Sequence, residues 1–213
     1  MIHTFAFDVG ETLVRDDRYW TAWADWLCIP RHTLSALVGA VVARGEDNAE
    51  ALRLIRPGID LHSQYQARED AGRGEYLDET DVYEDVRPAL SALRAAGAHV
   101  VIAGNQTVKA AALLRALELP ADLVATSGEW GVAKPSPAFF ERLVAESGVP
   151  ADQILYVGDH PQNDTFPAQA AGVRAAHLRR GPWGHLWAKE AAVVEAADHR
   201  IDSLMDLVPL AER

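Results

Sequence analysis

Three aspartates and one lysine have the types and spacing that phosphate chemistry requires. Asp8 ends the first apolar segment, and Lys134 lies in a loop before a proline. Asp159 and Asp164 follow a later apolar segment. Carboxylates in one crevice repel unless a cation neutralises them, and carboxylate oxygens suit Mg²⁺. The set predicts phosphoryl transfer, in which an aspartate attacks phosphorus while a metal and a lysine neutralise the equatorial oxygens.

The elements that must position these side chains alternate between strands and helices along most of the chain. We expect strands at residues 2–7, 98–103, 123–126, 153–157 and 173–178, and helices at 88–96, 107–117, 137–147 and 165–171. This alternation predicts an α/β fold with a doubly wound parallel sheet. Ligands bind at the carboxyl ends of the strands in such sheets. Gly104–Asn105 follow the second strand, so we expect them beside Asp8.

Residues 15–87 have a different pattern, with helical periodicity and no convincing strand. Trp20, Trp23 and Leu27 form one apolar stripe, and further helices are expected from Pro30 onwards. We therefore expect two domains. Residues 1–14 and 88–213 form the α/β core, and residues 15–87 form an all-helical insert.

Composition excludes several classes of protein. The 213 residues carry 20 basic and 31 acidic side chains, a formal charge of -11, which disfavours nucleic-acid binding. A single cysteine, Cys28, excludes an internal disulfide framework, and we expect it in the core of the helical insert. No apolar stretch is long enough for a membrane span, and the N-terminus lacks the features of a signal peptide. We expect a cytoplasmic protein with no membrane partner.

Three segments carry a family resemblance: Phe-Asp-Val-Gly-Glu-Thr-Leu at 7–13, Gly-Val-Ala-Lys-Pro at 131–135 and Val-Gly-Asp-His-Pro-Gln-Asn-Asp at 157–164. In their order and spacing they resemble the haloacid dehalogenase (HAD) superfamily of hydrolases, in its phosphatase-like branch. The resemblance implies a Rossmann-like HAD core. It also implies that residues 15–87 are a helical cap of the C1 type, between the first and second motifs.

The resemblance implies a role for each matching position. Asp8 would be the nucleophile, and Lys134 would bridge Asp8 and the phosphoryl oxygens. Gly104 and Asn105 would bind the phosphate. The implied Mg²⁺ ligands are three carboxylates and one backbone carbonyl: Asp8, Asp159, Asp164 and Gly10. The implied cofactor is Mg²⁺, and the implied partner is a small phosphorylated metabolite.

Two positions depart from the family pattern. Phosphatases of the family usually carry a second aspartate two residues after the nucleophile as general acid and base, and here that residue is Gly10. Glu11 is next, but adjacent side chains after a strand diverge. Loss of a general acid or base costs about 10²–10⁴-fold in rate. The second motif usually has Ser or Thr, and here it has Gly104. We expect slow turnover, or a substrate with a good leaving group such as an acyl phosphate or an anhydride.

Three other readings compete with this one. A non-catalytic binding protein on a HAD scaffold would explain both glycines. A 2-haloacid dehalogenase also lacks the second aspartate, because halide needs no proton, but the paired aspartates at 159 and 164 favour a metal instead. A phosphonate-cleaving enzyme would need a cap lysine, and residues 15–87 contain none.

Overall fold

The structure is a computed structural model and describes residues 1–211. The chain folds into two compact units. The first unit contains residues 1–15 and the chain from Asp78 onwards, and the second contains Asp16–Leu77.

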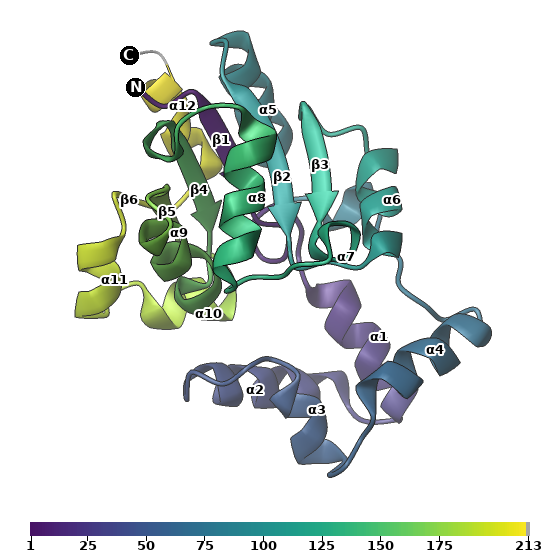
Figure 1. The fold of residues 1–213 in the computed structure, drawn as a ribbon. Helices are drawn as coiled ribbons and strands as arrows, with labels where there is room; N and C mark the ends of the chain where they lie inside the picture. Colours follow the sequence, from purple (N-terminus) through teal and green to yellow (C-terminus); the bar gives the residue numbers. More distant parts are fainter. Residues whose placement is uncertain (212–213) are drawn as a thin grey trace. The chain divides into compact units, whose positions relative to one another are not determined.

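A parallel sheet of six strands organises the first unit (Figure 1). Its strands are β1 (Thr4–Phe7), β2 (His99–Gly104), β3 (Leu123–Thr126), β4 (Ile154–Gly158), β5 (Arg174–Leu178) and β6 (His199–Ile201). The order across the sheet is β3-β2-β1-β4-β5-β6, and every pairing is parallel. The expected α/β class is confirmed. The strand order reverses beside β1, which is the point where ligands bind in sheets of this kind.

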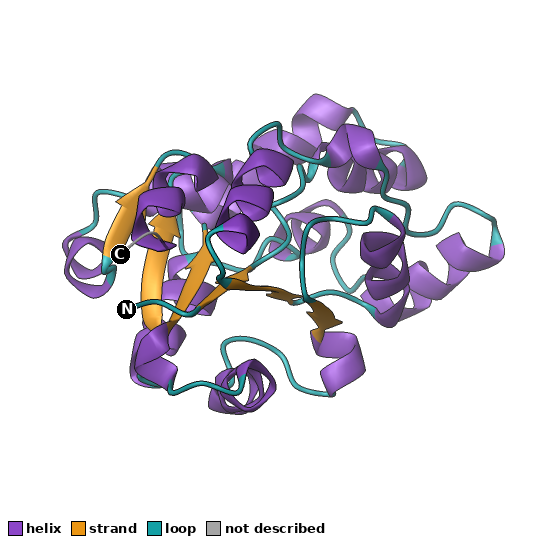
Figure 2. Cartoon of the chain, turned by 90° about the horizontal axis from the view of Figure 1, so that it is seen from above, coloured by secondary structure: helices purple, strands orange, loops and turns teal. Residues whose placement is uncertain are grey.

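Helices cover both faces of this sheet, as Figure 2 shows. The longer helices of the unit are α5 (Val86–Ala95), α6 (Val108–Ala116), α8 (Pro137–Ser147), α9 (Phe166–Ala170), α10 (Gly181–Trp187) and α11 (Ala191–Ala196). Single turns form α7 (Ser127–Trp130) and α12 (Val208–Ala211). Because both faces are covered, the central strands β1 and β4 are buried at every position, which explains their mostly apolar sequences.

Aromatic packing between α8 and β4 forms part of the core. Phe139 and Phe140 from α8 contact Tyr156 of β4 edge to face, with ring centroids 6.4 and 5.2 Å apart. All three side chains are essentially inaccessible to solvent. The Tyr156 hydroxyl donates to the Ala103 carbonyl at 2.6 Å, so the phenol is paired inside the core. This packing lies directly beneath the loop that carries Lys134, whose Nζ is 5.2 Å from the Tyr156 ring centroid.

The second unit consists of four helices, and its described residues contain no strand. They are α1 (Asp17–Leu27), α2 (Arg31–Val42), α3 (Glu50–Ile55) and α4 (Leu61–Asp70). Trp23 of α1 is fully buried and meets Tyr65 of α4 edge to face at 5.1 Å. The Arg68 guanidinium lies 4.5 Å from the Trp23 ring. Cys28 is exposed at the end of α1, so its expected place in the core was wrong.

The segment 78–87, expected in the helical insert, folds with the first unit. The reason is that the two connecting segments pair with each other. The Arg15 N–H donates to the Asp81 carbonyl at 2.8 Å, and the Tyr83 N–H donates to the Leu13 carbonyl at 3.0 Å. Backbone pairing at this point therefore places the division after Arg15 and before Asp78.

Candidate active site

Lys134 lies between two carboxylates at the carboxyl ends of the strands. Its Nζ is 2.7 Å from Asp8 Oδ1 and 2.6 Å from Asp164 Oδ1. The Lys134 and Asp164 side chains are each 1% exposed, and that of Asp8 is 13% exposed. Asp8 follows β1 and Asp164 follows β4, which are adjacent strands. The sheet thus brings together three residues that are far apart in the sequence.

The backbone around Lys134 is fixed by Asn105. The Asn105 side chain accepts a hydrogen bond from the Lys134 N–H and donates one to the Lys134 carbonyl, both at 2.8 Å. Asn105 was expected to bind phosphate. The structure shows its amide engaged with the loop that presents the lysine. This contact holds the end of β2 against the Lys134 loop.

Asp164 is positioned by a tight turn after β4. Residues Pro161–Thr165 form one π-helical turn, and Asp164 Oδ2 accepts a hydrogen bond from the His160 N–H at 2.9 Å. Gly158 leaves the room for this carboxylate, because a Cβ there would lie 2.1 Å from Asp164 Oδ2. Gly158 and the turn that follows it therefore fix the position of the Asp164 carboxylate.

Three carboxylates form a group that could hold a metal ion. Asp8, Asp159 and Asp164 each offer an oxygen, and these oxygens lie within 4.8 Å of one another. Asp159 and Asp164 are buried, at 4% and 1% exposure. The Lys134 ammonium lies at hydrogen-bonding distance from two of these carboxylates, Asp8 and Asp164. The donor set is all oxygen, which fits Mg²⁺.

The charges of this cluster perturb the pKa values within it. Burial raises the pKa of Asp8, Lys134 lowers it and Asp164 raises it, and the result lies above the usual value. Burial alone would lower the pKa of Lys134, but Asp164 and Asp8 hold it well above its usual value. Lys134 therefore stays a cation at neutral pH, whereas Asp8 is a carboxylate whose ionisation depends on nearby positive charge.

Gly104 is in contact with the predicted nucleophile. A Cβ at this position would lie 2.6 Å from Asp8 Oδ1 and 3.0 Å from Val9 Cγ2. Only glycine fits without a shift of the carboxylate that pairs with Lys134. The absence of a side chain at position 104 is therefore part of how this site is packed.

Glu11 is engaged away from the Asp8–Lys134 pair. The residue has a positive φ of 49°, and its Oε2 accepts a hydrogen bond from the Tyr83 hydroxyl at 2.5 Å. Gly181, with φ of 62°, packs against it, since a Cβ there would lie 2.5 Å from Glu11 Cβ and 3.1 Å from Asp159 Oδ2. Glu11 thus stands at the rim of the carboxylate cluster, with its own carboxylate bound to Tyr83. Gly10 precedes it and brings no side chain to the site.

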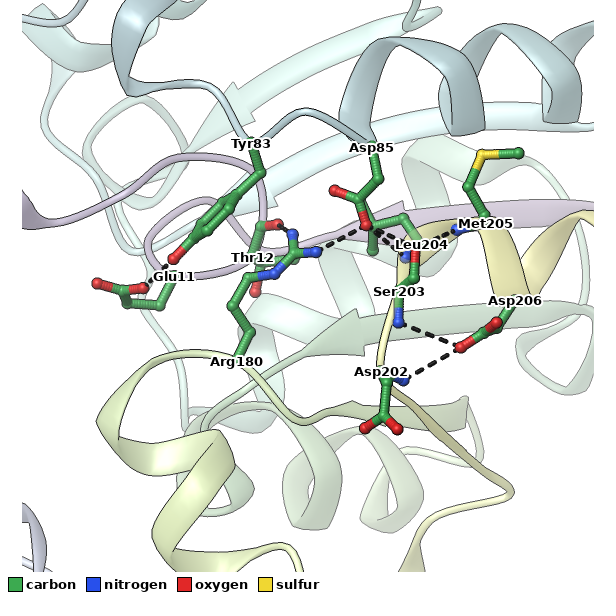
Figure 3. Close-up of polar contacts among 10 residues, drawn as sticks. All are labelled: Glu11, Thr12, Tyr83, Asp85, Arg180, Asp202, Ser203, Leu204, Met205 and Asp206. Carbon is green, nitrogen blue, oxygen red and sulfur yellow. Dashed lines mark hydrogen bonds and ion pairs between the residues drawn. The ribbon is translucent and has the colours of Figure 1, made fainter.

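Sequence reasoning missed a network centred on Arg180, shown in Figure 3. The guanidinium donates to the Thr12 carbonyl and to Asp85 Oδ2, both at 2.7 Å, and lies 4.1 Å from the Tyr83 ring centroid. Burial would raise the pKa of Asp85, but hydrogen bonds from Arg180, the Leu204 N–H and the Ser203 hydroxyl bring it below its usual value. The network ties the segment after β5 to both segments that lead to the helical unit. Its only sequence signal was the adjacent pair Arg179-Arg180.

Comparisons with known proteins agree with this geometry. A family model for haloacid dehalogenase-like hydrolases matches residues 2–172. A phosphoserine phosphatase of Thermus thermophilus is 44% identical over 59 residues, which are 28% of this chain and 24% of the relative. Phosphatase MT3486 of Mycobacterium tuberculosis is 29% identical over 170 residues, 78% of this chain and 73% of the relative.

Structural similarity extends over the whole chain. A solved haloacid dehalogenase-like hydrolase from Bacteroides fragilis superposes with a TM-score of 0.71 at 19% identity, covering 97% of this chain and 100% of that one. This likeness concerns the fold. Among curated relatives the matches are shorter, and the chain spans 24%, 42% and 38% of the length of three of them.

Proposed function

The chain belongs to the haloacid dehalogenase-like hydrolases, and on that premise we propose that it is a Mg²⁺-dependent phosphatase of a small phosphorylated metabolite. The observation that carries the proposal is the buried Lys134 ammonium, 2.7 Å from Asp8 and 2.6 Å from Asp164. An ammonium beside a carboxylate at a strand end provides both a nucleophile and a partner for phosphoryl oxygens. The phosphatase names of several relatives support the same chemistry.

Asp8 is proposed as the nucleophile. One carboxylate oxygen forms a bond to phosphorus, the bond from phosphorus to the leaving oxygen breaks, and its electron pair goes to that oxygen. Water then attacks phosphorus, and the bond to Asp8 breaks, which releases phosphate and restores the carboxylate. Lys134 orients Asp8 and neutralises the phosphoryl oxygens through both steps.

The proposed Mg²⁺ ligands are the carboxylates of Asp8, Asp159 and Asp164 and the carbonyl of Gly10. The oxygens of the three aspartates lie close enough together to ligate one ion. When bound, Mg²⁺ supplies positive charge that lowers the repulsion between these carboxylates and the phosphoryl group. The fit rests on the donor chemistry of the site, because Mg²⁺ prefers oxygen ligands and a cation reduces the repulsion between neighbouring carboxylates.

The proposed substrate has a leaving group that departs without a proton donor at position 10. Gly10 offers no acid, and the Glu11 carboxylate accepts its hydrogen bond from Tyr83. Acyl phosphates and anhydrides have leaving groups stable enough as anions to depart unprotonated. The helical unit is proposed as a cap that excludes water and selects the substrate. The proposed cap is then the helical unit, Asp16–Leu77, and the proposed catalytic core is the first unit.

A substrate screen tests this proposal. Purified protein is assayed for phosphate release from phosphoesters, acyl phosphates and anhydrides, with Mg²⁺ and with EDTA, beside Asp8→Asn. The matched control is Asp152→Asn, which removes an exposed aspartate near the start of β4. We expect phosphate release that requires both Mg²⁺ and Asp8. Release should be faster from acyl phosphates and anhydrides than from phosphoesters. No release across the panel would overturn the proposal, and so would 2-haloacid hydrolysis that persists in EDTA.

A further inference from the structure

A cavity lies in the first unit at the edge of the sheet formed by β5 and β6. Its volume is about 290 Å³, near the lower end of the range for small-molecule sites. The lining residues are His177, Arg179, Ala188, Lys189, Arg200, Ile201 and Asp202. None of these is a residue of the candidate active site.

Strand register places the polar lining side chains on one face. His177 of β5 pairs with Arg200 of β6, so both side chains point to the same side of the sheet. Arg179 lies two residues after His177, and Asp202 lies two residues after Arg200. Their side chains therefore lie on the same face of the sheet. Their side chains meet, with Arg179 Nε 2.6 Å from Asp202 Oδ1. The segment between α10 and α11 adds Lys189 to the wall.

The charge of this cavity is opposite to that of the chain as a whole. Lys189 and Arg200 form no ion pair with any residue between 1 and 211, and Arg179 is paired through Nε. Three cations thus face one carboxylate, in a chain with a formal charge of -11. Such a local positive site attracts a small anion, whereas the acidic remainder repels an extended polyanion.

His177 adds a buried polar side chain to the lining of the cavity. The residue is 1% exposed, its Nε2 lies 3.4 Å from the Gly184 carbonyl, and its Nδ1 has no hydrogen-bond partner in the part of the chain that the structure describes. Buried polar atoms of native proteins are normally paired, with protein, water or ligand. Because Nε2 faces the Gly184 carbonyl, Nδ1 is the acceptor of the neutral ring, and a hydroxyl group of a bound ligand or an ordered water would donate to it.

The backbone that presents Asp202 is held independently of the cavity. The N–H groups of Asp202 and Ser203 both donate to Asp206 Oδ2 at 3.1 Å, and the Leu204 N–H donates to Asp85 Oδ2 at 2.9 Å. Figure 3 shows the Asp202 carboxylate pointing away from these bonds. The turn after β6 is therefore fixed before any ligand binds, which lowers the entropy lost on binding.

We propose that this cavity binds a small molecule through a phosphate group, at a site distinct from Asp8. Arginine guanidinium groups present paired N–H donors that match phosphate oxygens, and a lysine adds a point charge. The volume admits one phosphate with a small attached group. This site goes beyond the proposed hydrolase function, because none of its residues takes part in that chemistry.

Calorimetric titration with inorganic phosphate tests the proposal. The buffer contains EDTA, because the metal-free carboxylate cluster at Asp8 repels phosphate. We expect binding with a dissociation constant of about 1 mM or tighter. Combined Lys189→Ala and Arg200→Ala substitutions should weaken it by about tenfold or more, because each removes a charged hydrogen-bond donor.

The matched control is Arg56→Ala, an exposed arginine of the helical unit. It makes no ion pair in the described chain, and its loss should leave phosphate affinity unchanged. No measurable binding to the unmodified protein, or equal affinity in the Lys189→Ala/Arg200→Ala variant, overturns the proposal. None of the substituted residues takes part in the hydrolase proposal, so failure of that proposal leaves this test valid.

Discussion

Replacing Lys134 by methionine should be strongly destabilising in the absence of divalent cations. Methionine keeps the length of the side chain but removes the charge between Asp8 and Asp164. The ammonium is 1% exposed and contacts both carboxylates within 2.7 Å. Removing one partner of a buried ion pair leaves an uncompensated charge, which costs about 3–5 kcal/mol.

Urea unfolding in EDTA measures this loss, with Lys189→Met as the control. Lys189 is an exposed lysine, so its substitution should change the free energy of unfolding by no more than about 0.5 kcal/mol. Adding Mg²⁺ should recover part of the Lys134→Met loss, since the ion replaces the missing charge. This rescue also keeps the test valid if the variant fails to fold in EDTA.

The free energy of unfolding of Lys134→Met should rise as pH falls. Burial already places the pKa of Asp8 above its usual value with Lys134 present, and removing the lysine removes the interaction that lowers it. A carboxyl group whose pKa is raised on folding binds its proton more tightly in the folded state, so the variant regains stability as pH falls. A loss below about 1 kcal/mol in EDTA, or one that grows as pH falls from neutral, would refute the buried-pair reasoning.

Three further variants test other contacts of the first unit. Gly10→Asp should raise turnover of a phosphoester with a poor leaving group by about 10²–10⁴-fold, and kcat unchanged on that substrate would show that the missing acid is not the defect. Gly104→Ser should lower kcat by about 10²-fold, because its Cβ would lie 2.6 Å from Asp8 Oδ1, and unchanged kinetics would contradict the packing argument. Asp85→Asn should cost about 2 kcal/mol at neutral pH. Because folding lowers the pKa of Asp85 below 3.8, that contribution is complete above this pH and is lost as pH falls further, so unfolding curves of variant and parent should converge in acid.

Local sequence patterns predicted much of the fold. The expected ranges for β3 and α8 match the structure, because each has a clear apolar pattern with a distinct start or end. The α10 helix begins at Gly181-Pro182, which resembles a turn in sequence, and β6 is only three residues long. Neither had enough periodicity to be predicted. The observed division between the units also differs from the expected one. The reason is that backbone pairing of Leu13 with Tyr83 joins two segments far apart in sequence.

The candidate site was predictable to the extent that strand ends determine it. Asp8 and Asp164 meet at Lys134 because parallel strands present their carboxyl ends at one edge. The Arg180 network was not predictable, since its hydrogen bonds span 168 residues to Thr12 and 95 to Asp85. No periodic pattern links residues at such separations.

Gly104 illustrates a different limit of sequence reasoning. The sequence showed only that the serine or threonine usual in the family at this position is replaced by glycine. The structure shows that a side chain there would displace Asp8. Such close approaches depend on the packed positions of two strands, so they become visible only in three dimensions.

The central claim is that Asp8 forms a covalent bond to phosphorus, and mass spectrometry of acid-quenched protein tests it most directly. The protein is mixed with Mg²⁺ and the best acyl phosphate from the screen, quenched during turnover and digested. We predict one phosphoryl group on the peptide that contains Asp8, lost on treatment with hydroxylamine and absent from Asp8→Asn. Phosphate release by both proteins at similar rates, with no adduct on that peptide, would contradict the account.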